Sequence, residues 1–219
     1  MKNTGYFAVV CGSSLFLFVS LWCCTISVYA ATCPAGKKYA IIQYDHTLRN
    51  VSTQQGSTFA QITTLSGGVG IQIKKQSVTN AGNDKINKEI EPLWSTPGCY
   101  CDAVQDPAQS LVTVKISGTC TSGKLTMHVH EENPESYATL ECTGGHCSSN
   151  IIFQPYPSAT SDYDLTIPFV NGAIVTQPYI CPNCSGNYSW KIIFTNKPPP
   201  MIHTAFSLVP LISPLILNH

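Results

Sequence analysis

Cys99-Tyr100-Cys101 begins the most informative stretch of this chain, and Thr143-Gly144-Gly145-His146-Cys147 ends it. Between them lie Cys120, Cys142 and two segments, 111–117 and 124–130, in which apolar and polar residues alternate. Alternation with a period of two residues indicates a β-strand with one buried face. The stretch therefore predicts strands that are joined to one another by disulfides.

The same pattern recurs on both sides of this stretch. Further strands are expected at 39–44, 58–65, 69–74, 137–142, 151–154, 163–170, 173–180 and 188–195. Short strands separated by turn residues, with no long amphipathic helix between them, are typical of all-β domains. We expect an antiparallel β-sandwich of jelly-roll, immunoglobulin or CUB-like architecture with about four disulfides.

Turn residues give three local predictions. Ser66-Gly67-Gly68 predicts a hairpin between strands 58–65 and 69–74. Asn171-Gly172 predicts a hairpin between strands 163–170 and 173–180, because both residues accept the positive φ of a type I′ turn. Segment 80–87 predicts a loop, and segment 85–94 predicts one or two helical turns that end before Pro97.

The cysteines predict a disulfide framework. Three of the eleven (Cys11, Cys23 and Cys24) lie in the N-terminal leader, which leaves Cys33, Cys99, Cys101, Cys120, Cys142, Cys147, Cys181 and Cys184. An even number in an exported chain predicts four disulfides, but eight cysteines allow 105 pairings. Local pairing of Cys142 with Cys147 and of Cys181 with Cys184 is one option, and pairing with other strands is the other. No helix pattern follows Cys181-Pro-Asn-Cys184, so we interpret it as structural rather than as a redox dithiol.

Residues 1–30 predict a secretory signal peptide. Lys2 supplies the positive charge, 6–24 is almost entirely apolar, and Val28-Tyr29-Ala30 predicts cleavage after Ala30. The alternative is an uncleaved membrane anchor, because the apolar run approaches the length of a spanning helix.

Residues 197–219 form a Pro-rich spacer and an apolar tail. The uncharged segment 205–217 is too short to cross about 30 Å of hydrocarbon as a helix, and Pro210 and Pro214 interrupt it. Such a tail fits a signal for a glycosylphosphatidylinositol (GPI) anchor, with Asn196 as the candidate attachment residue. The alternative is a tail that packs on the domain.

Between the two ends, residues 31–196 are predicted to form the disulfide-rich β domain. Two sub-halves that meet near 95–105 are an alternative organisation. Asn50-Val-Ser, Asn183-Cys-Ser and Asn187-Tyr-Ser are acceptor sequences for N-glycosylation, and Asn50 is expected in a polar loop after a strand.

The charge balance argues against a nucleic-acid partner. Lys and Arg number 12, as do Asp and Glu, so no global basic field is present. Charged residues make up only 11% of the chain, against about a quarter in ordinary domains. Thr, Ser, Gln and Asn take their place, which is common in secreted, glycosylated β-proteins.

No catalytic motif is present, and we predict neither an enzyme nor a cofactor. The chain lacks Gly-x-Ser-x-Gly, His-Glu-x-x-His, a phosphate loop and a dinucleotide fingerprint. His128-Val129-His130 has the spacing of a metal site, to which His146 would add a ligand. The alternative is that both histidines of this strand face outward while Met127 and Val129 face inward. The carboxylate pairs Glu131/Glu132 and Asp162/Asp164 are expected in polar loops as solvated charges.

Taken together, the sequence predicts an extracellular binding module. It would be a glycoprotein that is secreted or GPI-anchored at the outer face of the plasma membrane, with an extracellular protein or glycan as partner. The alternatives are a secreted metal-binding protein or enzyme that uses His128 and His130, and a freely secreted effector or inhibitor.

Overall fold

The fold is all-β. The computed structural model describes residues 32–103 and 108–201, and within them there are twelve strands and no helix. The strands are β1 (Lys38–Gln54), β2 (Ser57–Lys74), β3 (Ser77–Asn80), β4 (Lys85–Thr96), β5 (Cys99–Ala103), β6 (Ala108–Thr121), β7 (Lys124–Asn133), β8 (Ser136–Thr143), β9 (Ile151–Tyr156), β10 (Ala159–Pro168), β11 (Ile174–Pro178) and β12 (Cys184–Thr195). The predicted signal peptide and the apolar tail lie outside the described residues.

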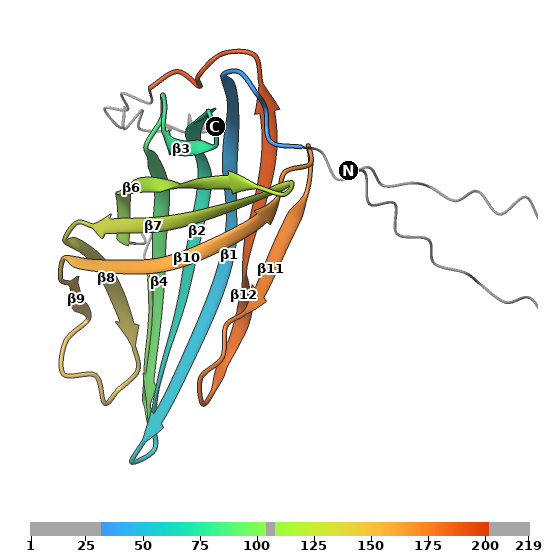
Figure 1. The fold of residues 1–219 in the computed structure, drawn as a ribbon. Helices are drawn as coiled ribbons and strands as arrows, with labels where there is room; N and C mark the ends of the chain where they lie inside the picture. The colour runs from blue at the N-terminus through green and yellow to red at the C-terminus, as the bar shows by residue number, and fades with distance from the viewer. Residues whose placement is uncertain (1–31, 104–107, 202–219) are drawn as a thin grey trace, which may run out of the picture.

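All twelve strands belong to one antiparallel sheet that curls into a small barrel with additional strands. The barrel follows the order β11-β12-β1-β2, passes through β3 and β4 to β6, and continues to β7 and β10. In Figure 1, β6, β7 and β10 run across the long strands β1, β2 and β12 at a steep angle. The two ends of the barrel sheet, β10 and β11, approach each other without pairing.

The interior of the barrel is filled by alternate residues of its strands. On β1 the inward positions are Ala40, Ile42 and Tyr44, and all three are buried. Tyr44 lies opposite Gly67 of β2 in the register, so the large ring faces a position without a side chain. A Cβ atom on Gly67 would lie 3.4 Å from the Cα of Ile86 on the neighbouring β4, which shows how tightly this layer is packed. The core includes residues from both sides of 95–105.

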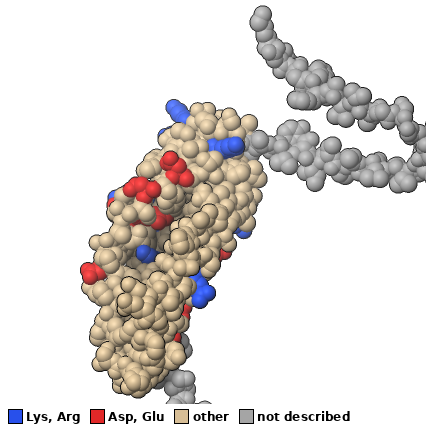
Figure 2. Space-filling model, turned by 90° about the horizontal axis from the view of Figure 1, so that it is seen from below, with Lys and Arg blue, Asp and Glu red and all other residues tan. Residues whose placement is uncertain are grey.

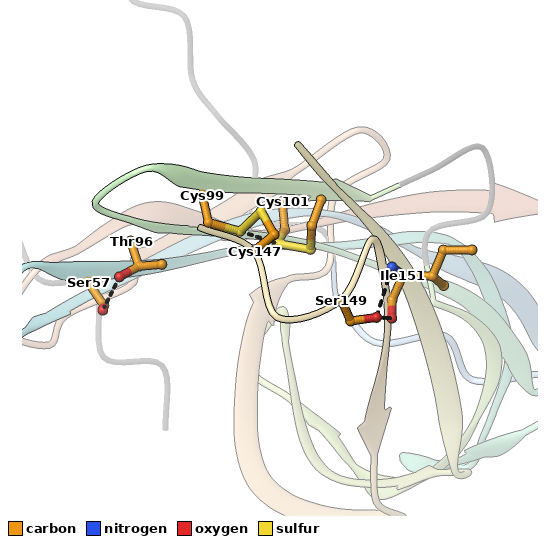
Figure 3. Close-up of a disulfide and its surroundings, with 8 residues drawn as sticks. Ser57, Thr96, Cys99, Cys101, Cys147, Ser149 and Ile151 are labelled. Atoms are coloured by element: carbon orange, nitrogen blue, oxygen red, sulfur yellow. Dashed lines mark hydrogen bonds between the residues drawn. A yellow bond between two sulfur atoms is a disulfide. The ribbon is translucent and has the colours of Figure 1, made fainter. Parts of the chain in front are cut away.

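The part of this sheet that lies beside the barrel, β4-β5-β8-β9, carries a second core in which cysteines predominate. Cys101 on β5 lies directly opposite Cys142 on β8 and is bonded to it. Cys99 is bonded to Cys147, and its Sγ lies 4.0 Å from the Sγ of Cys101 (Figure 3). Leu140 and Trp94 pack against these cysteines.

Hydroxyl groups lie at both ends of the region drawn in Figure 3. Ser57 donates a hydrogen bond to Thr96, and Ser149 both donates to the carbonyl of Ile151 and accepts from its amide (Figure 3). The first bond ties the start of β2 to the end of β4, and the second fixes the turn that leads into β9.

Each of the eight predicted half-cystines is in a disulfide: Cys33–Cys120, Cys99–Cys147, Cys101–Cys142 and Cys181–Cys184. The local option is therefore correct for Cys181 and Cys184 and wrong for Cys142 and Cys147. The prediction of an all-β, disulfide-bonded fold is confirmed. The jelly-roll, immunoglobulin or CUB-like sandwich is not confirmed, because the strands form one continuous sheet that curls into a barrel.

Several local predictions are wrong. Ser66-Gly67-Gly68 is not a turn but lies within β2, where Gly67 faces Tyr44. Segment 85–94 is strand β4 rather than helical turns, because it pairs with both β2 and β6. Asn171-Gly172 does not close a hairpin, since β10 pairs with β7 and β11 pairs with β12.

The hairpin turns occur at other dipeptides. Gln55-Gly56, Lys75-Gln76 and Ser122-Gly123 have positive φ at both residues and join β1 to β2, β2 to β3, and β6 to β7. This is the geometry of type I′ turns, which match the twist of the flanking strands. At Lys75-Gln76 two residues with side chains adopt it, so long-range strand pairing overrides the local preference for glycine.

The disulfides are predicted to differ in their contribution to stability. Cys101 and Cys142 are 41 residues apart, and Cys181 and Cys184 are three apart. The loop-entropy relation gives about 4 kcal/mol for the first bond and about 1.5 kcal/mol for the second. Urea denaturation of the Cys101→Ala/Cys142→Ala and Cys181→Ala/Cys184→Ala variants measures both losses. Equal losses in the free energy of unfolding would show that these bonds do not stabilise the protein through the entropy of loop closure.

Candidate functional site

The barrel interior contains a cavity of about 400 Å³. Its walls come from seven strands, and the lining residues are His46, Leu48, Thr63, Leu65, Lys88, Glu131, Asn133, Ser161, Tyr163, Asp164, Gln177, Tyr188 and Trp190. Figure 2 shows a hollow between two ridges, with acidic groups along one ridge and a basic group inside the hollow. The volume lies in the range of small-molecule sites, which favour the mouths of β-barrels.

The cavity arises because the inward-facing side chains change character along each strand. On β1 the inward positions continue from Ile42 and Tyr44 to His46, and on β7 they continue from Val129 to Glu131. On β4 the inward residue after Ile86 is Lys88. The strands are much longer than the usual five or six residues, so they extend beyond the aliphatic core and enclose this polar region.

Aromatic rings form one wall of the cavity around His46. The His46 ring centroid lies 4.8 Å from that of Trp190 and 5.3 Å from that of Tyr188, with edge-on geometry in both cases. Tyr188 stacks on Trp190 at 5.8 Å, and Tyr163 of β10 contacts Trp190 at 5.9 Å. Contacts of this kind hold the rings in fixed orientations, so the wall is pre-formed.

His46 is a buried neutral imidazole with a free polar atom. The residue is only 2% exposed, and burial lowers its pKa to about 4 although the Ser189 backbone and the Asp45 charge oppose the shift. Its Nε2 atom has no hydrogen-bond partner among the described residues. An acceptor in the Ser189 backbone favours the proton on Nδ1, in which case Nε2 carries the lone pair.

Glu131 is a buried carboxylate that is held by hydroxyl groups. It is 8% exposed and accepts hydrogen bonds from Tyr163 at 2.6 Å and from Ser161 at 3.1 Å. Since the Tyr163 hydroxyl gives its proton to Glu131, the Tyr44 hydroxyl at 3.3 Å must donate to Tyr163. Burial raises the pKa of both tyrosines, so they remain protonated donors. A buried carboxylate needs such donors to remain charged at an acceptable free energy.

Lys88 provides a positive charge in the same cavity. Its Nζ donates to the Asn133 Oδ1 at 2.9 Å. Burial lowers the pKa of Lys88, and the charge of Glu131 acts in the opposite direction. Within the described parts of the chain, neither Lys88 nor Glu131 lies within salt-bridge distance of an opposite charge.

The predicted metal ligands lie elsewhere. His128 and His130 project from the outward face of β7, opposite Asp164 and Asp162 of β10. His130 Nδ1 is 2.8 Å from Asp162, and this contact holds the pKa of the Asp162 carboxyl below its usual range. His128 lies 3.2 Å from Asp164, and Glu132 is paired with Lys115 on the same face.

His146 is not brought to these two residues. It follows β8, and its ring lies against Gly98, where a Cβ atom would collide with it. The one group of three potential metal ligands in the described residues is Cys99, Cys101 and Cys142, and all three are disulfide-bonded.

Two of the three glycosylation acceptors lie within the paired strands β1 and β12, and the third directly precedes β12. Asn50 is an exposed residue within β1, not in a loop as expected, and it lies opposite Cys184. Asn183 precedes β12, and Asn187 lies within β12 opposite Thr47. All three are exposed. The candidate attachment residue Asn196 is exposed immediately after β12.

Sequence reasoning missed the cavity residues. Glu131 was expected in a solvated loop, but it is buried because β7 runs to Asn133 and keeps its alternation. The alternation of the strand could have shown this: Glu131 occupies the same set of alternate positions as the buried residues Leu125, Met127 and Val129. His46 shares the phase of Ala40, Ile42 and Tyr44 in the same way. A polar residue at an apolar phase of a strand predicts a buried polar site.

Comparisons with protein-family models, curated proteins and solved structures found no match to this chain. Nor do the described residues contain a helix with the length and apolar character needed to cross a bilayer. The cavity is therefore interpreted from its own geometry.

The His46 environment predicts a specific pH dependence of stability. The unfolded imidazole binds a proton near pH 6.5 and the folded one near pH 4, so the free energy of unfolding falls as the pH is lowered between these values. We expect a loss of about 2 kcal/mol between pH 7 and pH 5 from this group.

Urea denaturation at both pH values, with wild type and the His46→Phe variant, measures this contribution. The variant is expected to lose about 2 kcal/mol less than wild type over the same interval. His146→Phe, at an exposed position, is the matched control. A pH dependence unchanged by His46→Phe would contradict the assignment.

Proposed function

We propose that this protein is an extracellular binding module whose ligand occupies the barrel cavity. It is a disulfide-bonded, N-glycosylated protein that is secreted or held at the outer face of the plasma membrane by a GPI anchor. Its role is recognition rather than catalysis. The observation that carries the proposal is the cavity itself, in which buried polar groups lie next to a rigid aromatic wall.

The chemistry of the cavity supports binding. The aliphatic part of the barrel is closely packed, whereas the cavity has a volume of about 400 Å³. The His46 Nε2 atom in its wall has no hydrogen-bond partner among the described residues. A buried polar atom without a partner is costly, so each one in a native structure calls for an explanation. A ligand with a hydrogen-bond donor would supply the missing partner.

The same geometry supports a non-catalytic role. The Ser161 hydroxyl donates to Glu131, and no hydrogen bond joins it to His46 among the described residues. A serine nucleophile needs an adjacent base that takes its proton, and its base needs a third group to orient it. The hydroxyls in this cavity serve instead to stabilise the Glu131 charge.

Filling the cavity tests the proposal. The probe is 1-anilinonaphthalene-8-sulfonate, whose fluorescence rises in apolar sites. Thr63→Phe places a ring in the lined space, and we expect it to abolish most of the fluorescence increase seen with wild type. Thr64→Phe is the matched control, because the neighbouring residue faces the opposite side of β2. A signal that survives Thr63→Phe would exclude the cavity as the binding site.

The mode of attachment has its own test. Cells that express the full chain are treated with a phosphatidylinositol-specific phospholipase C, which should release the surface protein into the medium. A chain truncated after Met201, where the described domain ends, should reach the medium without the enzyme. If the amount of protein at the cell surface does not change after treatment, the GPI anchor is contradicted, and the proposal of a secreted protein is unaffected.

A further inference from the structure

Two opposite charges that line the cavity, Glu131 and Lys88, do not pair with each other, while the third charged residue of the lining, Asp164, is exposed and pairs with His128 on the outer face. Glu131 comes from β7 and Lys88 from β4, and both occupy inward positions of the barrel. No salt bridge joins them, and none joins either of them to another charge in the described residues. Two opposite charges in one small space attract each other strongly in low dielectric, so their separation needs a structural cause.

Neutral partners hold the two charges apart. Tyr163 and Ser161 direct their hydroxyls at the two oxygens of Glu131. Asn133, two residues further along β7, accepts a hydrogen bond from the Lys88 ammonium. Each charge is thus fixed by its own neutral group, and each keeps hydrogen-bonding capacity: the ammonium has two further donors, and each carboxylate oxygen has another lone pair.

The unused capacity defines the ligand chemistry. The Lys88 ammonium requires a negatively charged or strongly polar acceptor, while Glu131 and His46 Nε2 require donors. A ligand with only one charge would leave the opposite protein charge without a counter-charge. A zwitterion satisfies both, because its carboxylate meets Lys88 and its ammonium meets Glu131.

Size and apolar surface narrow the class further. The cavity of about 400 Å³ leaves room for a side chain of a few carbon atoms beside the two charged groups. Leu48 and Leu65 provide an apolar surface for it, and the buried Nε1 of Trp190, which has no partner among the described residues, offers a further donor to the ligand carboxylate.

We propose that the cavity binds a free α-amino acid with an apolar side chain, with Glu131 and Lys88 as the two charge-recognising residues. This inference rests on the proposed binding function and specifies its ligand.

Three probes with the same side chain test the charge recognition on the wild-type protein. L-leucine carries both charges, 3-methylbutylamine lacks the carboxylate, and 4-methylpentanoate lacks the ammonium. Isothermal titration calorimetry is expected to show that each single-charge probe binds roughly tenfold to hundredfold more weakly than leucine, because each loses one charge-assisted hydrogen-bonded contact. Equal binding of leucine and either single-charge probe would overturn the proposal.

Two variants assign the charges to their residues. With Lys88→Met, leucine and 3-methylbutylamine should bind with similar affinity, since the carboxylate no longer has a partner. With Glu131→Gln, leucine and 4-methylpentanoate should bind with similar affinity, since the ligand ammonium no longer has a charged partner. Such a cycle isolates each pairwise contact. If Glu131→Gln fails to fold, the Lys88→Met cycle and the wild-type series still decide the matter.

Matched controls lie on the outer surface. Lys115→Met and Glu132→Gln remove an exposed pair on β6 and β7 and should leave the leucine preference unchanged. A preference that these variants abolish would place recognition outside the cavity.

The two levels of the hypothesis fail separately. Single-charge probes that bind as well as leucine, and lose binding in Thr63→Phe, would refute the zwitterion while the cavity stays a binding site. Leucine binding that persists in Thr63→Phe would refute both.

Discussion

Alternation along the strands is the constraint on which the rest of this structure depends. Each barrel strand sends every second residue inward, and antiparallel pairing keeps the neighbouring strands in phase. At one end the inward residues are aliphatic and fill the space. Further along the same strands the inward residues are His46, Lys88 and Glu131. They cannot form a hydrophobic core, because each polar side chain needs hydrogen-bond partners. The packed core and the cavity are therefore consecutive parts of one pattern.

The polar end of the barrel is stabilised by groups that also shape it. Tyr163 and Ser161 donate hydrogen bonds to the Glu131 carboxylate, and Tyr44 donates to Tyr163. Tyr44 itself fits because Gly67 lies opposite it. The disulfides are divided between the two cores: Cys33–Cys120 lies in the barrel core, whereas Cys99–Cys147 and Cys101–Cys142 form the core of the peripheral strands β5, β8 and β9, which contribute few aliphatic residues. Aliphatic packing thus dominates in the barrel, and covalent bonds dominate at its side.

Much of the secondary structure was predictable, and the pairing was not. Period-two segments correctly located most strands, and the strict alternation of 124–130 correctly placed His128 and His130 outward. Turn chemistry was less reliable. Asn171-Gly172 has the strongest hairpin signal in the chain, yet the strands beside it pair with β7 and β12, because burial against the barrel outweighs a local turn preference. Segment 85–94 was mistaken for helical turns because its pattern is short and its register partners are distant in sequence.

Strand periodicity and cysteine parity are enough to assign the all-β class and an even set of half-cystines, because both are local or additive properties. Strand pairing, cysteine pairing and the meeting of a glutamate, a lysine and a histidine from three distant segments in one cavity are visible only in the folded molecule. The physical reason is that inward placement of a polar residue depends on how far its strand extends and what lies opposite. That information resides in long-range pairing, not in the neighbours of Glu131 along the chain.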